Sequence, residues 1–413
     1  MKPKLRIDNV YKIFGNDPEA AINSLKQGKS KLEIFEETGQ TIGVQGVSFD
    51  VNEGEIFVVM GLSGSGKSTL VRMLNGLIPT TSGRILVDDE DVTCCSTEQL
   101  RDIRRNKIAM VFQHFALFPH KTVAENVAYG LKIKGETERR REKALAALEQ
   151  VGLAAYADSM PDELSGGMQQ RVGLARGLAT DPEILLMDEP FGALDPLIRR
   201  EMQEELLHLQ KILNKTIIFI THDLNEALLL GDKIAIMKDG MFVQVGTAQE
   251  IVDNPADDYV AAFVADIDRG RVFNAAHVAK RPVTVEQNEA GAAEKALRLM
   301  EEHNRNALYV VDKGKIAGVV TYQELAVAAR EEGRTDLSEV MVTEVPVVQR
   351  DTPLNELYGA ASAGYPIAMT DSQGRLAGVI EVEAVFSQLS GEASEPSGAA
   401  DNQSSSQATT QRN

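Results

Sequence analysis

A glycine-rich segment between residues 60 and 69 constrains this chain more than any other part of its sequence. It fits the pattern GxxxxGK[S/T] and reads Gly61-Leu62-Ser63-Gly64-Ser65-Gly66-Lys67-Ser68, followed by Thr69. The apolar run 56–60 before it predicts a buried strand, and residues 69–74 after it predict the start of a helix. In that context the loop N–H groups point inward at a polyphosphate, and the helix N-terminus adds a positive partial charge. The alternative is a glycine-rich turn that binds no ligand. Such a turn would not require the glycines, the lysine and the serine all to match the pattern.

Two side chains supply the chemistry of this loop. We expect the Lys67 ammonium to reach the β- and γ-phosphates of a nucleotide, and the Ser68 hydroxyl to hold Mg²⁺. The segment therefore predicts a nucleoside triphosphate and Mg²⁺ as cofactors.

The composition limits the other functions that the chain could have. At 413 residues we expect two or three domains. A formal net charge of −18 argues against a nucleic-acid partner, because phosphate backbones repel acidic surfaces. The cysteines, Cys94 and Cys95, are adjacent, which excludes an ordinary disulfide framework and fits a reducing compartment. The N-terminus is not followed by an apolar signal core, and no stretch approaches the length of a membrane span, so any membrane role must run through a partner.

Residues 1–265 alternate strands with helices, which predicts an α/β domain. Strands are expected at 4–14, 44–51, 56–60, 82–88, 107–112, 184–187, 216–220, 233–238 and 241–245. The polar segment 15–41 is interpreted as an insertion with helical pieces at 20–25 and 31–37. Residues 121–180 are expected to be a mostly helical subdomain, with an amphipathic helix at 138–151.

The C-terminal part of the chain contains an internal repeat. The pattern of residues 309–320 recurs at 368–380, with Gly318 and Gly378 at matching positions. We expect a linker at 266–280 and two small β-α-β-β-α units at 281–335 and 336–390. Residues 391–413 are rich in Ser, Gln, Ala and Thr, and are expected to be a disordered tail.

Four polar residues stand at the ends of apolar strands in the first domain. Asp188 ends a strand that would fix it beside the glycine-rich loop, where it can bind Mg²⁺, and Glu189 then projects toward the γ-phosphate to polarise water. The amide of Gln113 could coordinate Mg²⁺ or the attacking water. His222 can donate a hydrogen bond to the γ-phosphate and hold Glu189 and the water in place.

A second anion-binding helix end follows Leu164. The sequence reads Ser165-Gly166-Gly167-Met168, in which Ser165 is an N-cap candidate and the glycines allow close anion approach. Two helix ends could act on one phosphate only if they came from different copies of the chain. The arrangement predicts a head-to-tail homodimer with ATP between the subunits.

These motifs together resemble the nucleotide-binding subunits of ABC transporters. The resemblance identifies 61–68 as Walker A, Gln113 as the Q-loop residue, 164–168 as the signature, 184–188 with Glu189 as Walker B, Asp195 as the D-loop residue and His222 as the switch histidine. It implies an ATP-hydrolysing translocase with a P-loop NTPase fold and a helical subdomain. It also implies that Phe14 stacks on adenine. Met168 stands where the family most often has Gln, a change expected to tune the site without inactivating it.

Further segments resemble the osmoprotectant branch of ABC importers, which takes up glycine betaine or proline betaine. Residues 117–126 are similar to the surface that receives the permease's coupling helix, and the repeat looks like a tandem CBS pair, an α+β module. The resemblance implies permease subunits and an extracytoplasmic substrate-binding protein as partners. It also implies a peripheral location on the cytoplasmic face of the cell membrane.

Three alternatives stay open at this point. The cargo could be choline, carnitine or another solute, because a separate protein selects it. A soluble ABC ATPase of ribosomes or DNA repair is disfavoured, since such proteins usually have two cassettes or a coiled coil, and basic surfaces. The CBS pair could gate transport, through a ligand or a small basic cluster at Arg298, Arg305, Lys313 and Lys315, or it could be only a packed dimerisation module. Its Glu324, where nucleotide-binding relatives have Asp, argues against adenosine binding.

Overall fold

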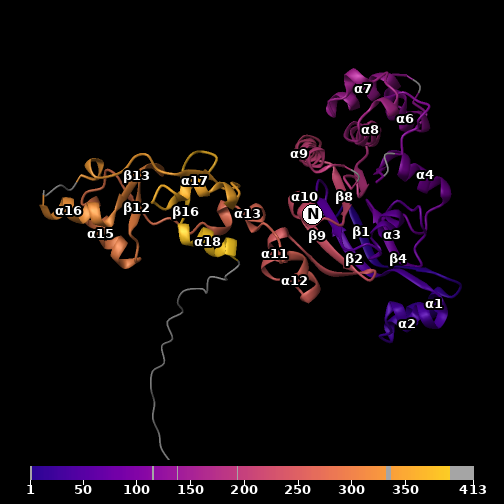
Figure 1. The fold of residues 1–413 in the computed structure, drawn as a ribbon, viewed down its shortest axis with the longest axis horizontal. Coiled ribbons are helices and arrows are strands. Elements are labelled where there is room, and N and C mark those ends of the chain that lie inside the picture. Colours follow the sequence, from indigo (N-terminus) through magenta and orange to yellow (C-terminus); the bar gives the residue numbers. More distant parts are fainter. Residues whose placement is uncertain (1, 114–115, 137, 193, 332–335, 391–413) are drawn as a thin grey trace, which may run out of the picture. The chain divides into compact units, whose positions relative to one another are not determined.

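The computed structural model describes residues 2–113, 116–136, 138–192, 194–331 and 336–390. The chain divides into the units Met1–Ile267 and Asp268–Asn413 (Figure 1). Each unit has hydrophobic clusters of its own. Within the described ranges, no helix combines the length and apolar character needed to cross a bilayer.

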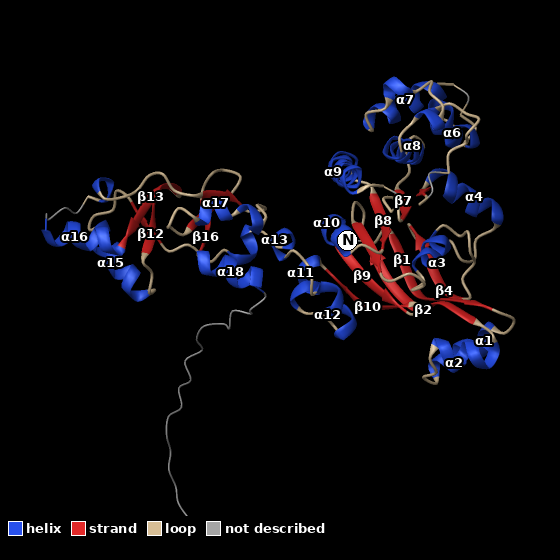
Figure 2. Ribbon diagram, viewed as in Figure 1, coloured by secondary structure: helices blue, strands red, loops and turns tan. Residues whose placement is uncertain are grey.

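The six-stranded sheet of the first unit contains the strands that the apolar runs predicted. Its order is β10-β9-β3-β8-β7-β6. Figure 2 draws its strands in red, with β7, β8, β9 and β10 labelled. The bounds are β3 Ile56–Met60, β6 Ile108–Val111, β7 Ile184–Asp188, β8 Thr216–Thr221, β9 Lys233–Lys238 and β10 Met241–Gly246. Neighbours pair in parallel, except for the antiparallel β9–β10 hairpin. All residues of β3, β7 and β8 are buried, because both faces of a parallel sheet are covered.

An antiparallel sheet of order β2-β1-β4-β5 accompanies it. The bounds are β1 Leu5–Phe14, β2 Thr41–Val51, β4 Ser82–Val87 and β5 Glu90–Asp91. The insertion between β1 and β2 forms α1 Pro18–Lys26 and α2 Lys31–Thr38, as its helical pieces predicted. Ser30 caps α2 in a capping box with Glu33, and Ile13, Ala21, Ile34 and Ile42 bury a small core of their own. The insertion is therefore a packed helical hairpin.

The remaining helices of this unit flank the sheets. They are α3 Lys67–Leu74, α4 Thr97–Asn106, α5 Val123–Val127, α6 Tyr129–Ile133, α7 Arg140–Gln150, α8 Gly166–Leu178, α9 Pro196–Leu213, α10 Leu224–Leu230, α11 Ala248–Asp253 and α12 Asp258–Val264, with 3-10 turns at Ala154–Tyr156 and Pro161–Glu163. Helices α5 to α8 form the helical subdomain expected at 121–180, and Figure 1 shows α6, α7 and α8 together, away from α3.

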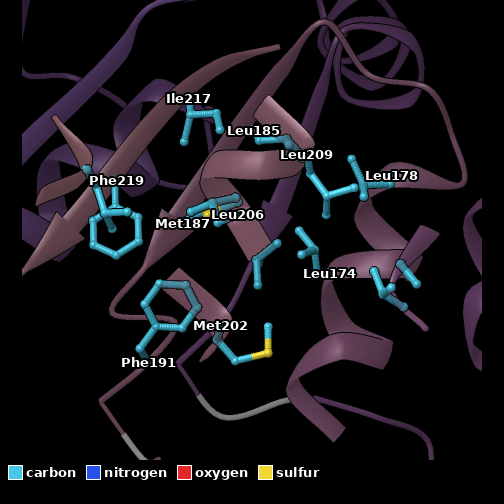
Figure 3. Close-up of a cluster of buried hydrophobic side chains, with 14 of the residues drawn as sticks. Leu174, Leu178, Leu185, Met187, Phe191, Met202, Leu206, Leu209, Ile217 and Phe219 are labelled. Atoms are coloured by element: carbon cyan, nitrogen blue, oxygen red, sulfur yellow. The ribbon is translucent and has the colours of Figure 1, made fainter. Parts of the chain in front are cut away.

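The main core lies between this sheet and helices α8 and α9 (Figure 3). Leu174 and Leu178 of α8 meet Leu206 of α9 over Leu185 and Met187 of β7 (Figure 3). Complete burial of one such side chain contributes about 1.5–3 kcal/mol. This packing fixes the carboxyl end of β7, where Asp188 lies, relative to α8 and α9.

The second unit contains two small sheets with the same element order. The first has β11 Thr284–Glu286, α15 Ala292–Glu302, β12 Ala307–Asp312, β13 Lys315–Thr321 and α16 Tyr322–Glu331. The second has β14 Val347–Gln349, a 3-10 turn Leu354–Glu356 with α17 Tyr358–Ala361, β15 Ile367–Thr370, β16 Leu376–Ile380 and α18 Val382–Ser390. In both, the first strand pair is parallel and the second antiparallel. This is the β-α-β-β-α order that the repeat predicted.

The segment 266–280 differs from its prediction as a linker. It forms α13 Arg269–Val272 and α14 Ala275–Val278, and it joins the second unit through the bridges Asn274–Pro353 and Lys280–Val379. Its polar residues suggested a linker, but Asp268 and Asn274 are helix N-caps and Phe273 is fully buried. The tail expected at 391–413 lies outside the described residues.

Candidate ATPase site

The glycine-rich loop connects β3 to α3 and is closely backed by other strands. Gly61 has a φ of 154°, and a Cβ there would lie 2.1 Å from the carbonyl oxygen of Met237 in β9. Gly66 has a φ of 109°, and its Cβ would lie 2.2 Å from the carbonyl oxygen of Gly43 in β2. Only glycine fits at either position, because a side chain would meet backbone that cannot move aside. Leu62, Ser63 and Gly64 are exposed at the outer side of the loop.

Lys67 begins α3 and turns back into the loop. Its side chain is 5% exposed, and its ammonium donates hydrogen bonds to the carbonyl oxygens of Gly61 (2.8 Å) and Leu62 (3.1 Å). Nζ also lies 4.0 Å from Oε1 of Glu189. Burial lowers the pKa of Lys67, and the nearby carboxylates oppose that shift. The loop thus holds a cation beside the end of β7.

Ser68 and Asp188 contact each other across the site. The Ser68 hydroxyl donates to Oδ1 of Asp188 at 3.0 Å, and Asp188 is 5% exposed. Burial raises the pKa of the Asp188 carboxyl, although Ser68 and the Arg72 guanidinium, 4.0 Å away, favour its charged form. A hydroxyl and a carboxylate are hard oxygen donors, the type that Mg²⁺ prefers.

Glu189 receives contacts from two of the predicted residues. Its Oε2 accepts a hydrogen bond from the Gln113 amide at 3.3 Å and lies 3.1 Å from Nδ1 of His222. Its backbone has a φ of 47°, the left-handed region, and its N–H donates to the carbonyl of Ile220 at 3.1 Å. The fold therefore brings Gln113, Glu189 and His222 together at the carboxyl ends of β6, β7 and β8.

The signature residues lie at the start of α8. Ser165 caps the helix by accepting a hydrogen bond from the N–H of Met168 at 3.4 Å, as predicted. A Cβ on Gly167 would lie 2.4 Å from Cγ2 of Ile198, so α8 and α9 approach closely there. Gly166 is the first residue of the helix. Helix α8 lies with the helical subdomain, away from α3 (Figure 1).

Asp195 is the N-cap of α9. Its side chain accepts hydrogen bonds from the N–H groups of Leu197 (3.2 Å) and Ile198 (3.1 Å). Asp195 follows Glu189 by six residues, so it marks where the segment after β7 enters α9.

Phe14 ends β1 and is 43% exposed. A Cβ on Gly43 would lie 3.0 Å from the Phe14 ring and 3.2 Å from the Thr69 methyl group, so both side chains flank the same glycine. The insertion that begins after Phe14 therefore leaves the ring next to the start of α3.

Sequence reasoning missed two contributors to this site. Arg72 lies close to Asp188, and its only local signal is a position four residues after Ser68 on the same helix. The turn between β9 and β10 supports the loop through a hydrogen bond from Gly240 N–H to the Ser65 carbonyl at 2.9 Å. No local pattern joins residues so far apart in the sequence.

The chain is similar in sequence to known transport ATP-binding proteins and in fold to a solved ABC transporter cassette. The family model described as ABC transporter matches residues 44–192, and that described as CBS domain matches residues 275–331. The chain is 49% identical over 391 residues to the glycine betaine transport ATP-binding protein OpuAA of Bacillus subtilis, covering 94% of this chain and 93% of the relative. It is 48% identical over 391 residues to the glycine betaine/carnitine transport ATP-binding protein GbuA of Listeria monocytogenes, with 94% and 98% covered. Among solved structures, the dimeric structure of a bacterial ABC transporter cassette matches at 33% identity and a TM-score of 0.50, over 59% of this chain and 98% of that chain.

Proposed function

The chain belongs to the ABC transporter ATP-binding subunits of the glycine betaine importer family, and we propose that it powers uptake of glycine betaine, proline betaine or a related quaternary amine. ATP hydrolysis is the activity of this family. The observation that carries the assignment of the site is the convergence of Gln113 and His222 on Glu189, beside Lys67. A hydrolysis assay on the full chain, with Glu189→Gln as the inactive comparison, tests it.

In the proposed mechanism, the buried Lys67 ammonium exchanges its bonds to the loop carbonyls for phosphate oxygens. The loop N–H groups and the start of α3 supply further positive potential. The Glu189 carboxylate then accepts a proton from the attacking water, and His222 and Gln113 hold that carboxylate in place. Electrostatic stabilisation by such preorganised groups is usually the largest part of catalysis of this kind.

Ser68 and Asp188 would hold Mg²⁺. Their contact at 3.0 Å and the burial of Asp188 supply two hard oxygen donors, and nucleotide phosphates complete the coordination of Mg²⁺ in sites of this type. Bound there, Mg²⁺ would neutralise charge on the phosphates. The Gln113 amide, a further candidate ligand for Mg²⁺, donates a hydrogen bond to Glu189.

We further propose that two copies of the chain bind ATP between them. Support comes from the capped, glycine-rich start of α8, which carries an anion-binding helix end away from the glycine-rich loop of its own chain. In this arrangement, Ser165, Gly166, Gly167 and Met168 of one copy face the phosphates bound by the other, Asp195 lies at the contact, and Phe14 stacks on adenine.

A groove between α4, α6 and α8 is the proposed docking surface for the permease. It is lined by Arg101, Arg104 and Arg105 of α4, Arg176 of α8, and the apolar side chains Phe112, Phe118, Tyr129 and Ile133. Asn126, fully buried, holds the adjoining loop by accepting from Phe118 N–H (2.7 Å) and donating to three carbonyls. A preformed groove with apolar and cationic walls suits an amphipathic segment with an acidic side chain. This docking would place the chain at the cytoplasmic face of the membrane.

The proposed cargo rests on the similarity to glycine betaine importers, and carnitine or choline is the alternative. An extracytoplasmic binding protein would make the selection. Co-purification of the permease and binding protein, followed by a ligand-binding assay with these amines, decides between the cargoes. Recovery of a ribosomal complex in place of a permease would contradict an importer role.

A further inference from the structure

Arg199, in the first turns of α9, connects the loop after Glu189 to the neighbouring helix α10. Its guanidinium donates a hydrogen bond to the carbonyl oxygen of Leu194 at 3.1 Å. The same side chain faces two carboxylates at the start of α10, with Nη1 3.6 Å from Oδ2 of Asp223 and Nε 3.9 Å from Oε1 of Glu226. None of the nucleotide-binding motifs described above includes Arg199 or Glu226.

Glu226 is hydrogen-bonded, directly or through one hydroxyl, to the residues on both sides of His222. It is 5% exposed and accepts hydrogen bonds from the Thr221 hydroxyl (2.6 Å) and the Gln203 amide (3.1 Å). The Thr221 hydroxyl also accepts a hydrogen bond from the N–H of Asp223 at 2.9 Å. Residues 221 and 223 are thus both tied to Glu226, directly or through one hydroxyl.

These contacts form a closed ring that includes Glu189, the proposed base. Leu194 follows Glu189 in the chain, and its carbonyl accepts a hydrogen bond from Arg199. Arg199 faces Glu226, which accepts a hydrogen bond from Thr221, the residue before His222. Nδ1 of His222 lies 3.1 Å from Glu189, which completes the ring. Within this ring, Arg199 and Glu226 form an ionic link between α9 and α10, beside the hydrogen bond from Gln203 of α9 to the same carboxylate.

The link is electrostatic and has no hydrogen bond of its own. Nε of Arg199 is buried without a hydrogen-bond partner, although Oε1 of Glu226 lies in front of it at 3.9 Å. Buried unpaired donors are rare in native proteins and require an explanation. Attraction between two opposite charges in a poorly solvated position is stronger than on the surface, so it can hold the helices at this separation. Burial also raises the pKa of Glu226, and Arg199 and the Thr221 hydroxyl favour its charged form.

We propose that Arg199 and Glu226 are positioning residues for ATP hydrolysis, which hold His222 against Glu189. In this proposal they act through the backbone of residues 221–223, and not by direct contact with the nucleotide or the attacking water. Loss of the link lets His222 move away from Glu189, while the glycine-rich loop between β3 and α3 is unchanged. The expected result is slower hydrolysis with normal ATP binding.

Conservative variants of the full chain test this assignment. Glu226→Gln keeps the shape, removes the charge and leaves one acceptor oxygen for the two donors Thr221 and Gln203, and Arg199→Ala removes the partner. Both should lower kcat about 10-fold to 100-fold, the effect of displacing a catalytic group by about 1 Å, and leave ATP affinity unchanged. Arg199→Lys, which keeps a charge without the planar fork, should fall between Arg199→Ala and the unmodified chain. Arg200→Ala and Glu204→Gln change exposed residues of the same helix and are the matched controls.

The double variant Arg199→Ala/Glu226→Gln should lose less activity than the product of the two single losses, because both changes break the same ionic link. A second readout separates positioning from general loss of structure. Ring resonances of His222, assigned with a His222→Gln variant, should shift in the Arg199 and Glu226 variants and not in the controls. The proposal is overturned if kcat in both single variants matches the controls, or if kcat falls while the His222 resonances stay unmoved. Should Arg199→Ala fail to fold, Arg199→Lys and Glu226→Gln decide by the same two readouts.

Discussion

Nδ1 of His222 lies 3.1 Å from Oε2 of Glu189, at the ends of two neighbouring parallel strands. The register of β7 and β8 sets this contact, because Asp188 is opposite Ile220 and Glu189 donates its N–H to the Ile220 carbonyl. A carboxylate that receives both an imidazole and the Gln113 amide is fixed in orientation. Catalysis by the Glu189 carboxylate requires both its negative charge and its position, and the two requirements can be tested with different variants.

Replacement of Glu189 by Gln tests the charge. We expect Glu189→Gln to bind MgATP normally, to hydrolyse it about 10²–10⁴ times more slowly, and to accumulate as a closed dimer, because an amide cannot accept the water's proton. Single-turnover hydrolysis and size-exclusion chromatography with ATP measure these effects, and Glu204→Gln on the exposed face of α9 is the control. Turnover near that of the unmodified chain would remove Glu189 from the catalytic role.

The proposed dimer can be tested with two separate lesions. Ser165→Arg should abolish hydrolysis without weakening ATP binding to the isolated chain, because the signature residues face the partner's nucleotide. A mixed dimer with one Ser165→Arg subunit and one Lys67→Ala subunit has one site with both lesions and one with neither. Residual hydrolysis in the mixture, absent from either variant alone, is the expected result. If one intact site can act alone, complete inactivity of the mixed dimer contradicts the shared-site arrangement.

The raised pKa of Asp188 predicts that its charged carboxylate lowers the stability of the folded chain, although Mg²⁺ binding requires that charge. Between the ordinary carboxyl pKa and the raised folded value, the folded chain binds more protons than the unfolded chain, so stability falls as pH rises through this window. Asp188→Asn removes the cost of the buried charge. It should raise the Tm of the nucleotide-free chain at neutral pH, lose this effect at pH below the ordinary carboxyl pKa, and weaken Mg²⁺-dependent ATP binding.

Thermal unfolding as a function of pH and ATP titration with and without chelator measure both effects. Asp181→Asn, at an exposed position before β7, is the control for the loss of one acidic residue. A Tm of Asp188→Asn that is unchanged or lower at neutral pH would show that burial does not penalise this charge.

Phe14 can be tested by affinity. Phe14→Ala should weaken ATP binding by about 0.5–1.5 kcal/mol, the usual contribution of a stacked aromatic pair, while Phe14→Tyr should bind normally. Fluorescence titration with ATP provides the comparison. Phe35→Ala, an exposed aromatic on α2 in the insertion, is the matched control. Equal affinities for Phe14→Ala and Phe35→Ala would exclude stacking on adenine.

The second unit can be tested by deletion at its boundary. Residues 281–390 contain 10 Lys/Arg and 17 Asp/Glu, a net charge of 10 − 17 = −7, which disfavours a simple lipid anchor. Of the four basic residues proposed for a cluster, Arg298 pairs with Glu302 and Arg305 with Glu381. Glu324 accepts a hydrogen bond from Thr321, so these two side chains already satisfy each other. The two arginine pairs argue against gating by a free basic cluster.

We expect removal of residues 268–413 to leave hydrolysis and transport intact and to make transport independent of salt. Uptake of labelled glycine betaine by reconstituted importers at increasing ionic strength measures this. Arg298→Ala in the full-length importer tests the cluster separately and should leave the threshold unchanged. A full salt threshold in the shortened importer would leave the second unit with only a structural role.

Local patterns were sufficient to identify the fold of the first unit and most of its site. The loop at 61–68 has a fixed spacing of glycines, lysine and serine, and apolar runs such as 184–187 mark strands buried on both faces. Since the carboxyl ends of parallel strands meet at one edge, residues that follow such strands, Gln113, Glu189 and His222, could be expected near the loop. The order of elements in the repeat could be predicted for the same reason.

Only the tertiary structure decided which of these residues touch and what supports them. The strand order β3-β8-β7-β6 places His222 and Gln113 on the same oxygen of Glu189, and no periodicity in the sequence encodes that order. The ionic link between Arg199 and Glu226 depends on the packing of α9 beside α10, and 266–280 joins the second unit through strand bridges to residues 353 and 379. Spacing and periodicity report the local backbone, whereas contacts between distant residues depend on how complete elements pack. The sequence alone therefore determined the kind of chemistry, and the packing determined the geometry in which it operates.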